Sequence, residues 1–205
     1  MNFYSKEKQD RFAYYLIGKK GTFLDIGCYN PVQWNNTKAL EEIGWTGLLF
    51  DIKEEWISLV QQHRLNPGFC VDVTDKAFVD TLNENLSNKT IDYISLDVDD
   101  ASISALNNVL ESDIEFKCMT FEHCLFEEPE QKQNSKDILE ARGYAFLFEN
   151  VLCDLSHDGY EELQPFEDWW INTKYFNQNI TELYAKDIFF EDCIQKLLRY
   201  KYDNK

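Results

Sequence analysis

The sequence lacks the cysteine and histidine pairs that build disulfide frameworks or zinc sites. Its 205 residues include six cysteines and three histidines, and no two cysteines form a Cys-x-x-Cys pair. Single cysteines scattered through apolar or mixed stretches are typical of reduced, buried side chains in a cytosolic protein. A structural zinc site is therefore not expected.

Long hydrophobic runs are missing as well. The longest apolar stretches, such as Tyr144–Phe148, are far shorter than the roughly 20 residues that a membrane-spanning helix needs. Residues 1–9 are polar and mixed in charge, without the apolar segment that directs secretion. These features predict a soluble, cytoplasmic protein.

Positive charge is scarce. Lys and Arg number 20 against 37 Asp and Glu, which gives a formal net charge of −17. A surface of that sign repels the phosphate backbone of nucleic acids and anionic membrane surfaces. The expected partner is a small neutral or cationic molecule, and neither a nucleic acid nor a membrane.

Glycine-rich phosphate-binding loops are absent from the sequence. A dinucleotide-binding G-x-G-x-x-G turn that starts at Gly27 would need glycine at positions 29 and 32, where Tyr29 and Val32 stand. No GxxxxGK[ST] loop and no GxSxG nucleophile motif occurs. These absences disfavour NAD-type enzymes, kinases, NTPases and serine hydrolases.

What the sequence does contain is an alternation of short apolar runs and helix-compatible stretches. The runs are almost continuously apolar, as expected for strands buried on both faces of a parallel sheet. The alternation predicts a Rossmann-like, doubly wound α/β fold with a mostly parallel sheet and an antiparallel edge strand. The five expected strands are Thr22–Ile26, Gly47–Asp51, Phe69–Val73, Ile91–Val98 and Phe116–Phe121.

Helix signals lie before and between these runs. Asn36 is a good N-cap and Gly44 a good C-terminal stop, and Asp51 with Glu54 has the spacing of a capping box. We expect a single domain over residues 1–205, with a helical lead-in over 1–20 and a Rossmann-like core over 21–157. The other expected helices are Phe3–Ile17, Ala101–Leu110 and Glu130–Arg142.

The C-terminal part breaks the alternation. The runs Tyr144–Glu149 and Val151–Leu155 are separated only by Asn150, so they should pair antiparallel at an edge or form a bulged turn. Residues 158–205 are expected to supply an aromatic lid or acceptor wall, Pro165–Phe176, and a C-terminal helix. The apolar stripe of that helix would hold Ile188, Phe189, Ile194, Leu197 and Leu198.

Acidic residues stand at or just past the carboxyl ends of the five expected strands. Ligands of open α/β sheets bind outside these strand ends, near the point where the strand order reverses, so the acids should converge on one rim. Any one of them can also be a turn residue or a helix cap. A carboxylate-rich rim suits hydroxyls, amines and positive charge, as in S-adenosylmethionine, better than phosphates. The acids are Asp25, Asp51, Asp72, Asp97 with Asp99 and Asp100, and Glu122.

From about Phe23 to Trp170 the sequence contains, in this order, FLDIG, the Asn36-Thr37 helix start, GWTGLLFD, IDYISLDVDDA, TFEH and ILEARGYAFLFENV. In their order and spacing these motifs resemble the FkbM-type methyltransferases, a Rossmann-like class I family that uses S-adenosylmethionine. The resemblance implies a methyltransferase that acts on a small hydroxylated acceptor such as a carbohydrate.

The resemblance also implies roles for single residues. Asp25, Gly27 and the backbone of Cys28 would hold the amino-acid end of the cofactor. Asp51 would bind the ribose, Asp72 and Val73 the adenine, and Asp97 would close the pocket near the sulfonium. The full set of candidate cofactor residues is Asp25, Gly27, Cys28, Tyr29, Asn36, Asp51, Ile52, Asp72, Val73 and Asp97.

The chain departs from the family pattern at two places. Tyr29 and Pro31 replace small residues of the first loop, and Asp99-Asp100 replaces Glu-Gly after the LDV motif. The first change favours an alternative function, a catalytically degenerate module that binds the cofactor or a partner protein without turnover. An NAD-dependent oxidoreductase is a third hypothesis, which the missing glycines disfavour.

The candidate catalytic residues are His123, Asp97 and Asp99. His123 stands next to Glu122, just past the fifth expected strand, and is the candidate general base for a hydroxyl acceptor. A lone histidine is more often a structural hydrogen-bonding residue, and only its expected place on the ligand rim makes the catalytic role equally plausible. A divalent cation, Mg²⁺ or Mn²⁺, is a further candidate cofactor with Asp97, Asp99, Glu122 and His123 as ligands, although clustered acids are more often helix caps.

Overall fold

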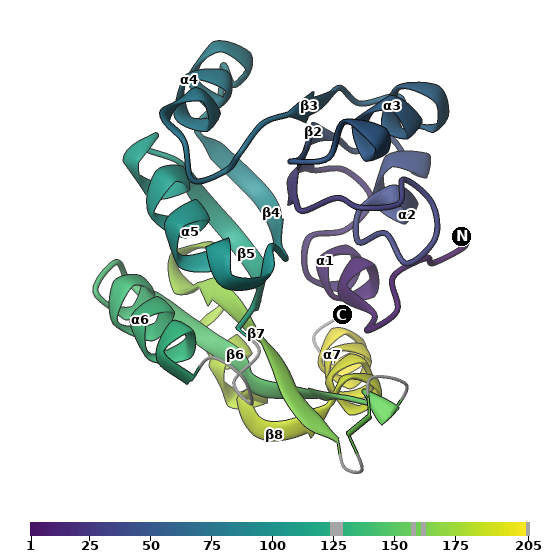
Figure 1. Cartoon of the computed structure of the whole chain (residues 1–205). Coiled ribbons are helices and arrows are strands. Elements are labelled where there is room, and N and C mark those ends of the chain that lie inside the picture. Colours follow the sequence, from purple (N-terminus) through teal and green to yellow (C-terminus); the bar gives the residue numbers. More distant parts are fainter. Residues whose placement is uncertain (124–128, 157–158, 161–162, 204–205) are drawn as a thin grey trace.

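The structure is a computed structural model, and it describes residues 1–123, 129–156, 159–160 and 163–203. Within these residues, eight strands form one sheet in the order β3-β2-β1-β4-β5-β7-β6-β8 (Figure 1). All neighbouring strands are parallel except the two pairs that include β7. The predicted mostly parallel α/β fold is confirmed, although its antiparallel strand lies inside the sheet rather than at an edge.

The first five strands lie where the apolar runs predicted them, within a few residues at each end. Because β1 pairs with β2 on one side and β4 on the other, the strand order reverses between β1 and β4, which is where α/β sheets bind ligands. The bounds are β1 Thr22–Ile26, β2 Thr46–Asp51, β3 Gly68–Cys70, β4 Thr90–Leu96 and β5 Glu115–Glu122.

Helices cover both faces of the sheet, and a separate hydrophobic cluster lies under each layer (Figure 1). One layer holds α1 (Gln9–Ile17), α2 (Lys38–Glu42), α3 (Glu54–His63) and α7 (Phe190–Asp203). The other holds α4 (Lys76–Asn85), α5 (Ser102–Glu111) and α6 (Pro129–Glu140). Short 3-10 helices span Asp99–Ala101, Thr173–Tyr175 and Gln178–Leu183.

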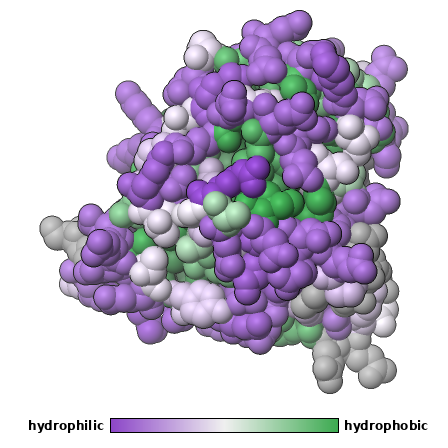
Figure 2. Space-filling view, turned by 90° about the vertical axis from the view of Figure 1, so that its left-hand side faces the viewer, coloured by the Kyte–Doolittle hydropathy of each residue, from purple (hydrophilic) through white to green (hydrophobic). Residues whose placement is uncertain are grey.

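The surface on the side of α4, α5 and α6 is mostly hydrophilic, with a smaller hydrophobic area near its centre (Figure 2). This distribution is typical of helices that pack one apolar stripe against a sheet and expose the other face to water. Within the described part of the chain, no helix combines the length and the apolar character needed to cross a bilayer.

The expected aromatic lid is instead a central strand. Residues Gln164–Asn172 form β7, which lies between β5 and β6. Trp169 and Trp170 are fully buried on opposite faces of the sheet, because successive side chains of a strand alternate in direction. The ring of Trp169 lies 4.6 Å from that of Phe12, and the ring of Trp170 lies 3.7 Å from that of Phe146. The segment is therefore not a lid, whereas its alternative role as an acceptor wall stays a prediction.

The two runs around Asn150 form one long strand, β6 (Tyr144–Cys153). They do not pair with each other, and the pairing of β6 with β7 shifts register near Asn150, whose φ is 54°. The bulged alternative was therefore the better prediction. A further strand, β8 (Ala185–Phe189), contains Ile188 and Phe189, which the sequence had placed on the last helix. Neither β8 nor α4 was expected.

Candidate functional site

A cavity of about 500 Å³ lies at the carboxyl ends of β1, β2, β3 and β4, across the point where the strand order reverses. The segments after these four strands line it, together with the N-terminal segment, Leu155 just past β6 and Phe166 of β7. All the candidate cofactor residues line this one cavity: Asp25, Gly27, Cys28, Tyr29, Asn36, Asp51, Ile52, Asp72, Val73 and Asp97.

The first loop enters the cavity at Gly27, whose φ is 87°. A Cβ atom at this position would lie 1.8 Å from the carbonyl oxygen of Asp97, so only glycine fits there. The amides of Gly27 and Cys28 both donate to the carbonyl of Phe50 at 2.9 Å, which ties the loop to β2. Position 27 is a glycine because the backbones at the ends of β1 and β4 approach each other too closely there for a side chain.

Asp25 holds the far end of the same loop. It is 1% exposed, and its Oδ2 accepts hydrogen bonds from Thr37 Oγ1 at 2.6 Å and Asn35 Nδ2 at 3.2 Å. Burial raises the pKa of Asp25, and the nearby Arg64 guanidinium opposes this effect. Asn36 lies beside it, donating from Nδ2 to Ser95 Oγ at 3.0 Å.

Asp51 and Asp72 present carboxylates to the cavity from the ends of β2 and β3. Asp51 accepts the amides of Tyr29 and Lys53, one on each oxygen and both at 2.9 Å. A carboxylate has about four lone-pair sites, so each oxygen can still bind a ligand hydroxyl. Asp72 accepts from Thr74 Oγ1 at 2.7 Å and Thr74 N at 2.9 Å, and these bonds lower the pKa of Asp72.

Apolar surface lies between these carboxylates. Ile52 is 64% exposed and Val73 is buried, and both line the cavity. The rings of Tyr29 and Trp56 also line it, with their centroids 4.3 Å apart. A flat heterocycle and a polar ribose can therefore be accommodated by neighbouring parts of the same wall.

Asp97 directly follows β4 and lines the cavity. Burial and the adjacent carboxyl group of Glu122 raise the pKa of Asp97 well above its usual range. Asp99 also lines the cavity, and its amide donates to Glu122 Oε2 at 3.4 Å. Asp97 is therefore a titratable group inside the cavity whose protonated form is favoured by burial and by a neighbouring carboxyl group.

His123 is not brought to the cavity. It is completely buried, its amide donates to the carbonyl of Phe166, and its Nε2 lies 3.4 Å from Asp168 Oδ1. The two carboxylate oxygens of Asp168 in turn accept hydrogen bonds from Lys132 Nζ, at 2.9 Å for Oδ1 and 3.0 Å for Oδ2. A general base must reach the proton that it removes. The geometry therefore does not support the prediction of His123 as the base.

The predicted metal ligands are divided in the same way. Asp97 and Asp99 line the cavity, whereas Glu122 and His123 are not among its lining residues. Among residues 1–123, 129–156, 159–160 and 163–203, no group of three or more His, Cys, Asp or Glu side chains is arranged to hold a metal ion. The suggestion of a divalent cation has no support in this geometry.

Three residues that the sequence did not indicate line the cavity from the N-terminal segment: Lys6, Glu7 and Gln9. Lys6 Nζ lies 3.5 Å from Glu7 Oε1, and Gln9 Nε2 donates to Glu167 Oε2 at 3.3 Å. Burial raises the pKa of Glu7. These residues reach the site because α1 packs against α7 and the sheet, and no sequence motif marks such a tertiary contact.

Comparison with known proteins identifies the fold. Neither a family model nor a curated protein matches this sequence. Among solved structures, an O-methyltransferase from Bacillus cereus in complex with S-adenosylhomocysteine is similar, with a TM-score of 0.58 and 11% identity over 81% of this chain and 80% of that one. A candidate rRNA methylase from Clostridium thermocellum has a TM-score of 0.56 and 12% identity over 83% and 99% of the two chains. A Podospora anserina methyltransferase bound to S-adenosylhomocysteine has a TM-score of 0.55 and 10% identity over 82% and 78%. The chain has the Rossmann-like fold of class I methyltransferases.

Proposed function

We propose that the chain is an S-adenosylmethionine-dependent methyltransferase. The observation that carries this proposal is that Asp25, Asp51, Asp72 and Asp97, from four strand ends, line one cavity together with the close backbone turn at Gly27. Two proteins that share the fold were solved with S-adenosylhomocysteine. A positively charged nucleoside suits a site of this charge better than a dinucleotide phosphate does.

The residues present fit this cofactor. The backbone carbonyls at Gly27 and Cys28, with Asn36, would hold the α-ammonium of its amino-acid end, since both amides already donate to Phe50. Asp51 would accept the ribose hydroxyls. Asp72 and Tyr29 would flank the adenine, with Ile52 and Val73 as the apolar wall. When bound, S-adenosylmethionine supplies an electrophilic methyl group on a positively charged sulfur.

The contribution of the chain itself is positioning and proton transfer. Methyl transfer is an in-line displacement, so holding the acceptor in line with the methyl group supplies most of the rate enhancement. A hydroxyl acceptor must also lose its proton. Asp97 is the better candidate for this step than His123, because Asp97 lines the cavity and a general base must reach the proton that it removes.

The acceptor that we propose is a small hydroxylated molecule such as a carbohydrate, as the FkbM-type resemblance implies. It would lie against Glu7, Gln9 and Phe166. Phe166 belongs to β7 and Gln9 donates to Glu167 of the same strand, whereas Asp51 and Asp72 lie at or just past the ends of β2 and β3, on the other side of β1 and β4. Carboxyl groups accept hydrogen bonds from hydroxyls, whereas an anionic acceptor, including a nucleic acid, would be repelled from this lining.

Calorimetric titration with S-adenosylmethionine, S-adenosylhomocysteine and NAD tests the proposal. We expect saturable binding of the first two and none of NAD. A transfer assay with labelled S-adenosylmethionine and a panel of sugars then tests O-methylation. Binding of NAD alone would overturn the proposal, whereas cofactor binding without transfer to any acceptor would favour the catalytically degenerate module.

A further inference from the structure

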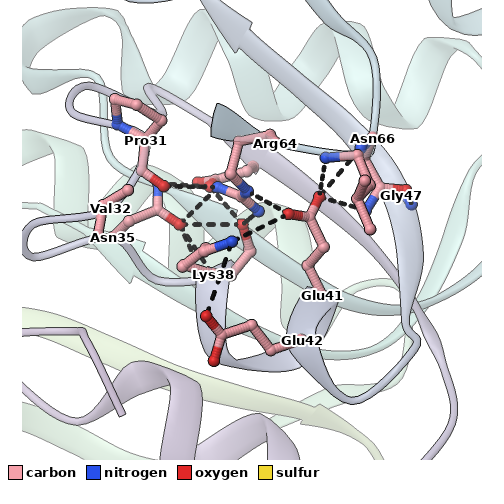
Figure 3. A network of polar contacts seen from close by, with 12 residues as sticks. Pro31, Val32, Asn35, Lys38, Glu41, Glu42, Gly47, Arg64 and Asn66 are labelled. Carbon is pink, nitrogen blue, oxygen red and sulfur yellow. Dashed lines mark hydrogen bonds and ion pairs between the residues drawn. The ribbon is translucent and has the colours of Figure 1, made fainter. Parts of the chain in front are cut away.

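Arg64, the residue after α3, lies beneath the first loop and connects three of its residues (Figure 3). Its Nη1 donates to Asn35 Oδ1 at 2.9 Å and to the carbonyl of Pro31 at 3.3 Å, and its Nη2 donates to Thr37 Oγ1 at 2.9 Å. The guanidinium side chain is fully buried, so these bonds are shielded from water. One cation thus spans the loop from residue 31 to residue 37.

The opposite side of the guanidinium is held by Glu41. Arg64 Nε donates to Glu41 Oε1 at 2.9 Å. The other oxygen of Glu41 accepts from Asn66 Nδ2 at 2.6 Å and from the amides of Leu65 and Asn66 at 3.2 and 3.0 Å (Figure 3). Arg64 therefore has a fixed position relative to α2 and to the segment that leads into β3.

The loop above Arg64 needs such support, because two of its non-glycine residues have left-handed backbone angles. The φ of Tyr29 is 46° and that of Trp34 is 60°. Residues held in this region persist when the surrounding structure fixes them. The hydrogen bonds of Arg64 to Pro31, Asn35 and Thr37 supply that fixation in a loop that has no glycine after Gly27.

Arg64 itself is not among the residues that line the cavity, but it contacts residues that do. Asn35 lines the cavity, and Thr37 connects Arg64 to Asp25 through its 2.6 Å hydrogen bond. Asp72 and Val73 follow β3 and face the other part of the cavity, where the Asp72 carboxylate is held by Thr74. The Arg64 network therefore supports one end of the cavity, and a separate set of bonds holds the other.

We propose that Arg64 is a positioning residue that shapes the part of the cavity that binds the amino-acid end of S-adenosylmethionine. This inference rests on the proposed function. Binding of the amino-acid part of the cofactor, which would face the first loop, should depend on Arg64. Binding of the adenosine part, which would face Asp51, Asp72 and Val73, should not.

The test compares two ligands, S-adenosylhomocysteine and 5′-methylthioadenosine, which lacks the amino-acid part. The double variant Glu41→Gln/Arg64→Met removes both buried charges together, so that neither is left without its partner. We expect its affinity for S-adenosylhomocysteine to fall at least tenfold in calorimetric titration. Its affinity for 5′-methylthioadenosine should change less than twofold.

A milder variant, Thr37→Val, keeps both charges and removes only the hydroxyl between Arg64 and Asp25. We expect it to lower the affinity for S-adenosylhomocysteine, but not that for 5′-methylthioadenosine, by a smaller factor than the double variant does. The control is Val109→Ala in the core under α5, which lowers stability on the other face of the sheet and should leave the ratio of the two affinities unchanged.

The outcomes separate the two proposals. A wild-type protein that binds neither ligand contradicts the proposed function. If the wild-type protein binds both ligands and the folded variants lose affinity for both equally, or for neither, the role of Arg64 is contradicted. The proposed function then still stands.

Discussion

The backbone of Gly27 lies so close to that of Asp97 that a Cβ atom at position 27 would be 1.8 Å from the Asp97 carbonyl oxygen. The two residues directly follow β1 and β4, the neighbouring strands between which the strand order reverses. Their contact sets the distance between the first loop and the segment that begins with Asp97, and so the width of the cavity at this point.

Gly27→Ala should therefore destabilise the fold and abolish cofactor binding. The φ of 87° costs an alanine about 1–3 kcal/mol, and the clash with Asp97 adds about 1–3 kcal/mol from overpacking. Denaturant unfolding and titration with S-adenosylhomocysteine measure the two effects. The matched control is Gly44→Ala, at a position with φ 94° and nothing within 4 Å of the added atom. Equal losses of stability in both variants would contradict the importance of the contact.

The raised pKa of Asp97 predicts a specific pH dependence of stability. The folded chain binds the Asp97 proton more tightly than the unfolded chain, in which an aspartate has a pKa of about 3.9. The unfolding free energy therefore falls as the pH rises from that value through the folded pKa. The fall amounts to about 1.4 kcal/mol for every pH unit that separates the folded from the unfolded pKa.

Asp97→Asn removes this ionisation, so its unfolding free energy relative to wild type should be higher at pH 8 than at pH 4. Thermal unfolding across this range gives the comparison, with Asp75→Asn at an exposed residue as the control. Loss of hydrogen bonds in the variant shifts both ends of the curve equally and does not mimic the effect. A difference that stays constant with pH would show that the pKa of Asp97 is not raised in the folded protein.

His123→Gln should affect stability more than turnover. His123 is fully buried beside Asp168 and outside the cavity, so the substitution disturbs a packed polar group rather than a reacting one. We expect the unfolding free energy to drop by about 1–3 kcal/mol and turnover to change by only a few fold, whereas Asp97→Asn should lower turnover by about 10²–10⁴-fold. Full stability with a large loss of turnover in His123→Gln would restore His123 as the general base.

The difference between His123 and Asp97 shows how far the sequence alone could predict the site. Strand ends are visible as the last residues of an apolar run, so the acids at or just past the carboxyl ends of β1, β2, β3 and β4 could be placed on one rim. The direction of a side chain just past β5 depends on its partner strand. That partner is β7, which the sequence presented as an irregular aromatic segment.

The unrecognised strand β7 also explains the other incorrect predictions about the fold. Trp169 and Trp170 stand in an aromatic stretch without polar–apolar alternation, because β7 is buried on both faces and paired on both edges. Local patterns report burial and periodicity, but not which strands become neighbours. The packing of α1 against α7 and the sheet brings Glu7 and Gln9 to the cavity, and the sequence held no signal for this contact either.

We expect Asp51 to bind the ribose of the cofactor. Both Asp51 oxygens already accept a backbone amide, from Tyr29 and Lys53, which fixes the plane of the carboxylate in the cavity. A charged hydrogen bond contributes about 1.5–3 kcal/mol, so Asp51→Asn should weaken adenosine binding by about tenfold or more.

The loss of affinity alone would not identify the ribose as the partner, because the substitution also disturbs the loop amides. Titration with 2′,3′-dideoxyadenosine separates the two effects. Wild type should prefer adenosine over the dideoxy nucleoside, and Asp51→Asn should bind the two almost equally, because the hydroxyls no longer have a carboxylate to bind. If the variant kept the full preference of the wild type, Asp51 would be a loop-fixing residue and another group would have to bind the ribose.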